Sequence, residues 1–149
     1  MSEPTPKALN NTFEVKRTVK PYNFSRPFWE ATREKKLVIQ YCRRTGKYQH
    51  HSRPTSIFTG RRSDLEWREV SGKGEVFSWT IAHRGPLPFQ GHEPYLVVSV
   101  TLDVGVNFIA NMVNCTREEI RIGMKVVPYW LPLPDGTHLL MFQPERSSN

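Results

Sequence analysis

Alternating apolar and polar residues dominate the second half of the chain, a pattern typical of half-buried β-strands. Residues 75–83 (EVFSWTIAH) alternate along their whole length, and residues 95–102 (YLVVSVTL) form the most apolar run. A tight turn over residues 103–105 joins that run to a further strand over residues 106–113, so the two strands predict a hairpin. Three more short strands are predicted over residues 65–70, 125–130 and 139–142.

Thr116 and Glu119 have the spacing of a capping box, which predicts one helical turn over residues 117–120, between the later strands. Short strands interrupted by one helical turn favour a small Greek-key barrel with the architecture of an OB-fold. An SH3-like barrel is the main competing architecture. The predicted fold class is therefore mainly β.

The first half of the chain predicts a helix followed by a polar hairpin. Residues 27–36 (PFWEATREKK) follow Ser25, a favourable N-cap, and place a proline in the first turn. Residues 37–41 (LVIQY) predict a strand, whereas residues 42–62 are polar and lack apolar periodicity, as in an irregular hairpin.

Four segments are predicted from these patterns: a flexible arm over residues 1–23, the helix and hairpin over 24–64, the barrel over 65–144 and a tail over 145–149. Within the arm, Phe13 and Val15 are the apolar side chains available to dock on a neighbour.

The chain is basic. Its 21 Lys and Arg residues exceed its 14 Asp and Glu residues, which gives a net charge of +7. Positive charge favours polyanionic partners such as nucleic acid, an anionic membrane or coenzyme A. No apolar run has the length of a membrane span, and residues 1–11 lack the apolar core of a secretory signal. With only Cys42 and Cys115, no disulfide framework is indicated, and we expect a cytoplasmic protein.

The order of motifs along the chain is distinctive. A helix containing FWE is followed by LVIQYCRRTGKY, DLEW, SGKGEVFSWTIAHR, EPYLVVSVTLD, REEIRIGMKV and DGTHLLMFQPE. From about Phe24 to Pro144 this order resembles the family of rubredoxin-like zinc-ribbon plus OB-fold proteins known as domain of unknown function 35. The resemblance implies a non-catalytic auxiliary subunit of a thiolase-superfamily complex that acts on an acyl-CoA by acyl transfer, thiolysis or retro-aldol cleavage. It implies a hetero-oligomer, in a two-plus-two assembly.

In such a complex the chain would stabilise its partner and help to form the channel for coenzyme A and substrate. Candidate contacts with coenzyme A or with the partner are Lys47, Arg53, His83 and Arg84. Candidate interface residues are Phe28, Trp29, Tyr48 and Phe58. We expect no catalytic residue and no cofactor bound by this chain alone, because the coenzyme A thioester would occupy a site shared with the partner.

The zinc-binding motif of the family is incomplete in this sequence. The usual ribbon has two CxxC knuckles, because four thiolates close a tetrahedral shell around Zn²⁺. Here residues 42–45 (CRRT) and residues 56–59 (SIFT) occupy the two knuckles, and the glycines that follow are kept as Gly46 and Gly60. Hydroxyls replace three of the four thiolates, at Thr45, Ser56 and Thr59, and only Cys42 is kept.

A different set of ligands is chemically available in the same region: Cys42, His50, His51 and Asp64. Their spacing matches no closed metal site, so we do not expect zinc. Metal binding normally contributes to the folding of such a hairpin, and a metal-free hairpin is then expected to depend on a partner surface for its order.

Two other functions fit parts of the sequence. An OB-fold with a basic groove can bind single-stranded nucleic acid by stacking aromatic side chains on bases, and the candidates are Phe77, Trp79 and Tyr95. A stand-alone enzyme would need His83 or Cys115 as its reactive group, but no supporting constellation of acid, base or metal is visible in the sequence.

Overall fold

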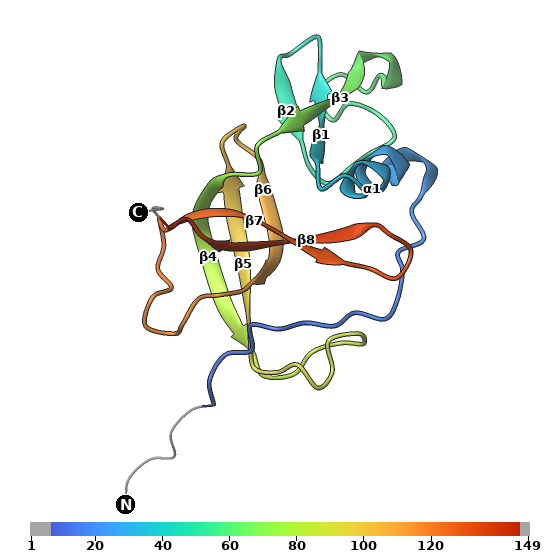
Figure 1. Cartoon of the computed structure of the whole chain (residues 1–149). Helices are drawn as coiled ribbons and strands as arrows, with labels where there is room; N and C mark the ends of the chain where they lie inside the picture. Colours follow the sequence, from blue (N-terminus) through green and yellow to red (C-terminus); the bar gives the residue numbers. More distant parts are fainter. Residues whose placement is uncertain (1–6, 147–149) are drawn as a thin grey trace, which may run out of the picture.

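The computed structural model describes residues 7–146, which form one open β-sheet and one closed β-barrel (Figure 1). The open sheet has the order β2-β1-β3 and consists of β1 (Leu37–Cys42), β2 (Lys47–Gln49) and β3 (Leu65–Val70). The barrel has the order β4-β5-β6-β8-β7 and consists of β4 (Gly74–Ala82), β5 (Tyr95–Leu102), β6 (Asn107–Met112), β7 (Lys125–Pro132) and β8 (His138–Pro144). One short helix, α1 (Arg26–Thr32), follows the 3-10 turn Asn23–Ser25, and a second such turn, Arg62–Asp64, precedes β3. The prediction of a mainly β chain with an OB-like barrel is confirmed.

Strand β3 belongs to the open sheet, which corrects the predicted start of the barrel at residue 65. All of β3 pairs with β1, from Leu37 opposite Val70 to Cys42 opposite Leu65. β1 pairs with the short β2 on one edge, and β3 covers its other edge, whose N–H and C=O groups would otherwise be unpaired. An alternating pattern identifies a strand but does not specify which sheet the strand joins. Because β3 pairs with β1 in the open sheet, the barrel begins at β4.

The barrel closes weakly between β6 and β8. These two strands share a single pair, Met112 opposite Phe142, whereas β5 and β6 pair along the whole predicted hairpin. Helix α1 lies beside this opening, and its Phe28 ring stacks on Phe108 of β6 with centroids 6.1 Å apart. Phe28 is 7% exposed and forms part of the chain's own core, which corrects its assignment as an interface residue.

Helix α1 is attached to β8 through Thr32, which is completely buried. The Thr32 hydroxyl accepts a hydrogen bond from the backbone N–H of His138 at 3.0 Å, and its carbonyl oxygen lies 2.7 Å from His138 Nδ1. The helix ends at Thr32, earlier than predicted, and the charged residues that follow form a turn with Lys35 at a φ of 57°.

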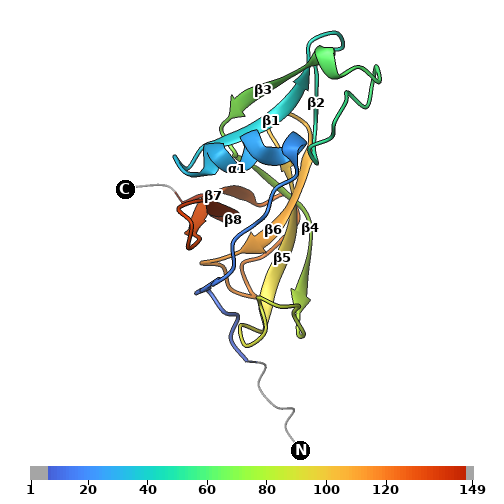
Figure 2. The ribbon, with the colours of Figure 1, turned by 90° about the vertical axis from the view of Figure 1, so that its right-hand side faces the viewer.

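Residues 7–22 form an extended segment that runs along the barrel (Figure 2). Phe13 and Val15 are buried against the barrel, and the Phe13 ring packs edge-on against Tyr95 at 5.7 Å. The two side chains therefore dock on this chain itself. Residues 1–6 of the predicted arm and 147–149 of the predicted tail lie outside the described residues.

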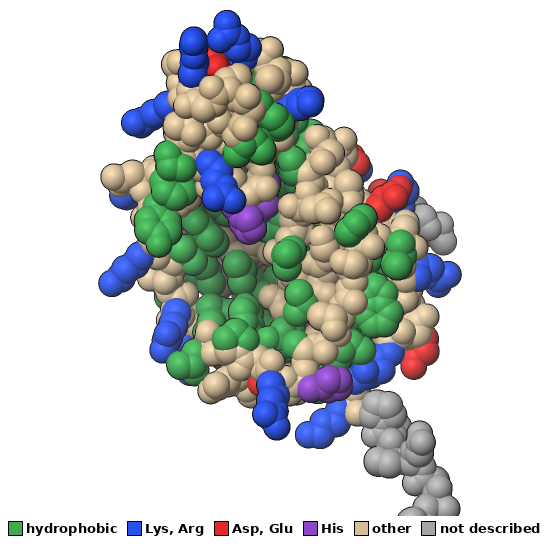
Figure 3. Space-filling view, turned by 180° about the vertical axis from the view of Figure 1, so that it is seen from behind, with side chains coloured by type: hydrophobic (Ala, Val, Ile, Leu, Met, Phe, Trp, Pro, Cys, Tyr) green, Lys and Arg blue, Asp and Glu red, His purple; other side chains and the backbone are tan. Residues whose placement is uncertain are grey.

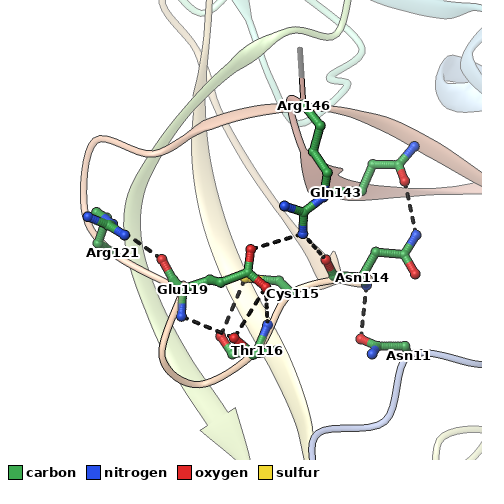
Figure 4. A network of polar contacts seen from close by, with 8 residues as sticks. All are labelled: Asn11, Asn114, Cys115, Thr116, Glu119, Arg121, Gln143 and Arg146. Atoms are coloured by element: carbon green, nitrogen blue, oxygen red, sulfur yellow. Dashed lines mark hydrogen bonds and ion pairs between the residues drawn. The ribbon is translucent and has the colours of Figure 1, made fainter. Parts of the chain in front are cut away.

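A polar network joins this N-terminal segment to the end of the barrel (Figure 4). Asn11 accepts a hydrogen bond from the backbone N–H of Asn114 at 2.9 Å, and Arg146 bonds to Asn114 O and to Glu119. Thr116 and Glu119 form the reciprocal hydrogen bonds of the predicted capping box, although the segment is a turn and not a helix. In the described part of the chain, no helix has the length and apolar character needed to cross a membrane.

Candidate functional site

The two predicted knuckles lie side by side at the end of the open sheet. Cys42 ends β1, Ser56 lies in the loop after β2, and the Ser56 hydroxyl donates a hydrogen bond to Cys42 Sγ at 3.2 Å. The backbone N–H of Gly46 donates to Cys42 O, and that of Gly60 donates to Ser56 O, both at 2.8 Å. Gly46 and Gly60 have φ angles of 72° and 74°, in the left-handed region that favours glycine. The two turns therefore have equivalent geometry.

Ser56 and Thr45 control the chemistry of the Cys42 thiol. The hydrogen bond from Ser56, followed by that from Thr45, stabilises the thiolate and lowers the Cys42 pKa to about 7. Cys42 is fully buried and Ser56 is 1% exposed, so this pair lies inside the hairpin. Ser56 Oγ also accepts hydrogen bonds from the backbone N–H groups of Phe58 and Thr59.

This donor set does not fit the zinc ion that the resemblance implies. A tetrahedral zinc site needs four nitrogen, sulfur or carboxylate ligands, and the knuckles offer one thiol with neutral hydroxyls. Across residues 7–146, no three His, Cys, Asp or Glu side chains are grouped closely enough to hold a metal ion. Asp64 Oδ2 is buried without a hydrogen-bond partner, but it too belongs to no such group.

Two buried glutamines link the strands of the hairpin to the loop that follows. Gln49 on β2 donates to Gln40 Oε1 on β1 at 2.8 Å and accepts from the backbone N–H of Ile57 at 2.9 Å. Gln40 bonds to both the backbone N–H and the carbonyl of Arg53, each at 2.8 Å. This network was not predicted from the sequence, where the only available signal was a glutamine within the apolar run LVIQY.

The tip of the hairpin combines exposed apolar side chains with arginine and lysine. Ile57 is 63% exposed and Phe58 is 40% exposed, and Lys47 Nζ lies 5.4 Å from the centroid of the Phe58 ring. The other cations of the tip are Arg43, Arg44, Arg61 and Arg62. Within residues 7–146 none of these cations pairs with a carboxylate, because the ion pairs there all lie elsewhere. We call Ile57, Phe58 and these five cations the basic tip.

A groove of about 600 Å³ opens between the N-terminal segment, α1, the loop after β2 and the β6–β8 opening. Figure 3 shows it as a hollow with a hydrophobic lining and with Lys and Arg side chains around its outer edge. Its walls are formed by Tyr22, Phe24, Trp29, Phe89, Phe108 and Leu139, together with His50, Arg53 and Ile109. Burial, followed by the neighbouring His51, lowers the pKa of His50 to about 4, so the imidazole is neutral at pH 7.

The four predicted coenzyme A contacts are not brought together. Arg53 borders the groove and Lys47 lies at the basic tip. His83 and Arg84 are exposed and follow β4, and His83 lines a separate depression with Lys7 and Arg117. Of the interface candidates, Phe58 is exposed, whereas Trp29 and Tyr48 are partly buried against the core.

Of the residues that favoured other functions, Tyr95 and Cys115 are buried, whereas Phe77, Trp79 and His83 are exposed. Tyr95 is 3% exposed and cannot stack on a base, although Phe77 and Trp79 are exposed on β4. Cys115 is 1% exposed, and burial raises its pKa to about 11, so this thiol is neutral at physiological pH. A neutral buried thiol is a poor nucleophile.

Comparisons with known proteins agree with this fold. The family model described as "ChsH2, C-terminal OB-fold domain" matches residues 67–131, which places most of the barrel in an OB-fold family. A DUF35 domain-containing scaffold protein of Pyrococcus furiosus is 35% identical over 107 residues, which cover 72% of this chain and 77% of the relative. The chain therefore belongs to the DUF35 family.

Two further proteins are similar to this chain. A solved structure described as "Ltp2-ChsH2(DUF35) aldolase" matches with a TM-score of 0.75 and 31% identity, covering 85% of this chain and 98% of that chain. A probable enoyl-CoA hydratase alpha subunit of Thermomonospora curvata is 32% identical over 143 residues, or 93% of this chain. The present chain spans 44% of the length of that relative.

Proposed function

We propose that this chain is a non-catalytic auxiliary subunit of a thiolase-superfamily complex that acts on a coenzyme A thioester. The observation that carries the proposal is the match to the chain of the "Ltp2-ChsH2(DUF35) aldolase", because it extends over 98% of that chain. The scaffold proteins of the same family support a role in assembly. The covalent steps of acyl transfer, thiolysis or retro-aldol cleavage then belong to the partner.

The side chains of this chain suit binding better than catalysis. Cys115 is buried with a raised pKa, and Cys42 lies inside the hairpin with its sulfur hydrogen-bonded to Ser56. Both thiols are buried within the described residues, away from solvent. The basic tip presents cations and exposed apolar groups, which suit acidic and apolar surfaces.

The partner surface in this proposal includes the basic tip. Exposed Ile57 and Phe58 would be buried in the complex, and the surrounding cations would face carboxylates of the partner or phosphates of coenzyme A. Lys47 and Arg53 remain candidate phosphate contacts. A surface of this kind also explains how a metal-free hairpin keeps its order in the assembly.

The proposal is tested by co-expressing the chain with a thiolase-superfamily protein encoded beside it. We expect the two to copurify, with a native mass that fits two copies of each, and we expect this chain alone to show no turnover of acyl-CoA. Adding it should raise the solubility or the turnover of the partner. A chain that stays monomeric and leaves both properties unchanged would refute the proposal.

A further inference from the structure

Strand β4 has a free edge along its second half. It pairs with β5 from Gly74 to Ala82, but with β7 only at Gly74 and Glu75. The N–H and C=O groups of Val76 bond to the loop between β6 and β7. Within residues 7–146, no further backbone hydrogen bond reaches residues 77–82 on the side away from β5. In Figure 2 this part of β4 lies at the outer margin of the barrel.

Alternation along the strands identifies the backbone groups that are free. Residues of β5 bond alternately to β4 and to β6, and the Leu102 N–H donates on the side of β6, so the even-numbered residues of β5 face β6. The odd-numbered residues face β4, where two of them pair with Ser78 and Thr80. The N–H and C=O groups of Trp79 and Ile81, which alternate with these two, therefore point away from β5.

This edge lacks the charges and prolines that normally keep the edges of sheets apart. Residues 78–82 (SWTIA), beyond the bulge at Phe77, contain neither. Phe77 is 59% exposed and Trp79 is 40% exposed. An exposed, uncharged edge that carries an aromatic side chain is suited to pairing with another strand.

We propose that this free edge pairs with the same edge of a second copy of the chain, antiparallel and about a two-fold axis at Thr80. Trp79 of each copy then lies opposite Ile81 of the other, and the two Thr80 side chains lie opposite each other. Aromatic with β-branched and Thr with Thr are favourable cross-strand pairs. The outward backbone groups of Trp79 and Ile81 also meet, and the two-fold axis repeats these hydrogen bonds in both halves of the pair.

The charges that flank the edge favour a second copy as the partner. Glu75 precedes the edge and is 50% exposed, although it also pairs with Lys125. His83 and Arg84 follow the edge and are exposed. Antiparallel self-pairing brings the basic end of each edge towards Glu75 of the other copy, so opposite charges meet at both ends. This proposal goes beyond the proposed function and does not rest on it, because no other protein takes part.

Sedimentation equilibrium of the full chain tests the proposal. We expect a concentration-dependent dimer with twice the mass of the 17.4 kDa chain. The dimer should tighten as salt is added, because each copy carries a net charge of +7. Thr80→Lys places like charges opposite each other at an exposed position and should weaken dimerisation by about tenfold. Thr18→Lys, at an exposed threonine of the N-terminal segment, is the matched control and should change it by less than about twofold.

A charge swap separates loss of pairing from loss of folding. Thr80→Glu alone should also weaken dimerisation, but an equimolar mixture with Thr80→Lys should form a mixed dimer at least about tenfold tighter than either variant forms with itself. A chain that stays monomeric at every concentration, equal effects of Thr80→Lys and Thr18→Lys, or no gain on mixing would overturn the proposal. Each of these results would leave the proposed function intact, since copurification with a thiolase-superfamily partner is a separate measurement.

Discussion

Ser56 joins the two knuckle turns, because its hydroxyl donates to Cys42 and accepts from two backbone N–H groups. We predict that Ser56→Ala raises the Cys42 pKa from about 7 towards 9.0, since the main hydrogen bond that stabilises the thiolate is lost. The variant also leaves two N–H groups without their acceptor and should lower the free energy of unfolding by about 1–3 kcal/mol. The pKa is measured from the ¹³C shift of labelled cysteine, and the stability by urea denaturation. Ser52→Ala, in the same loop, is the control that should change neither.

The Cys42 pKa also predicts how stability depends on pH. The folded value of about 7 lies below the ordinary 9.0, so the unfolded state binds more protons between these two values. The contribution of Cys42 is therefore complete above pH 9 and is lost as the pH falls to about 7. We expect the Tm of the wild-type chain, compared with Cys42→Ser, to rise over this window. A parallel pH profile for the two proteins would contradict the assigned hydrogen bonds.

At the scale of single residues, the sequence predicted only those features that depend on the spacing of neighbouring residues. The two knuckles were identified because CRRT and SIFT have the same length and are each followed by glycine, and the structure places Cys42 against Ser56. Gln40 and Gln49 were missed, because a glutamine in a short strand has no local sign of burial. Their role arises only when β1, β2 and the following loop are folded together.

At the scale of elements, Gly72 connects the open sheet to the barrel. Its φ is 77°, and an added Cβ would lie 2.5 Å from Pro128 Cγ on β7. Gly91 has a similar φ of 90° with nothing near the added atom. We predict a loss of about 1 kcal/mol for Gly91→Ala, from backbone strain alone, and of about 2–4 kcal/mol for Gly72→Ala. Thermal and urea unfolding measure both, and equal losses would show that the contact between Gly72 and Pro128 is unimportant.

The equivalent knuckle turns predict that the hairpin can be given a metal site. In a Thr45→Cys, Ser56→Cys, Thr59→Cys variant, three new thiols join Cys42 at the four knuckle positions. We expect this variant to bind one zinc per chain, to show the visible absorption of tetrahedral cobalt thiolate with Co²⁺, and to lose Tm on chelation. The wild-type Tm should not respond to the chelator. The Ser56→Cys single variant, which lacks a full ligand set, is the control. A folded triple variant that binds no zinc would mean that the four positions do not face one centre.

At the scale of the whole molecule, the barrel was predictable and the groove was not. Strong alternation in residues 75–83 and 95–102 predicted a half-buried sheet, and the chain buries that sheet by closing a barrel. The groove takes its walls from the N-terminal segment, α1, the loops after β2 and β4, and strands β6 and β8. No local pattern marks a surface assembled from segments so far apart in the sequence. The burial of Phe13 also depends on contacts between segments far apart in sequence.

The distribution of charge over the whole molecule gives a prediction for partner binding. The net charge is +7, and the basic tip holds cations that make no ion pair within residues 7–146. If this tip meets an acidic partner, Arg61→Glu with Arg62→Glu should slow association at low salt by about tenfold or more, with a smaller change in the dissociation rate. Lys16→Glu with Arg17→Glu makes the same change of net charge at two exposed positions of the N-terminal segment and should have a much smaller effect. Stopped-flow or surface-binding kinetics at two salt concentrations measure both rates. Equal slowing by the two double variants would assign the effect to net charge, and the basic tip would then have no special role in recognition.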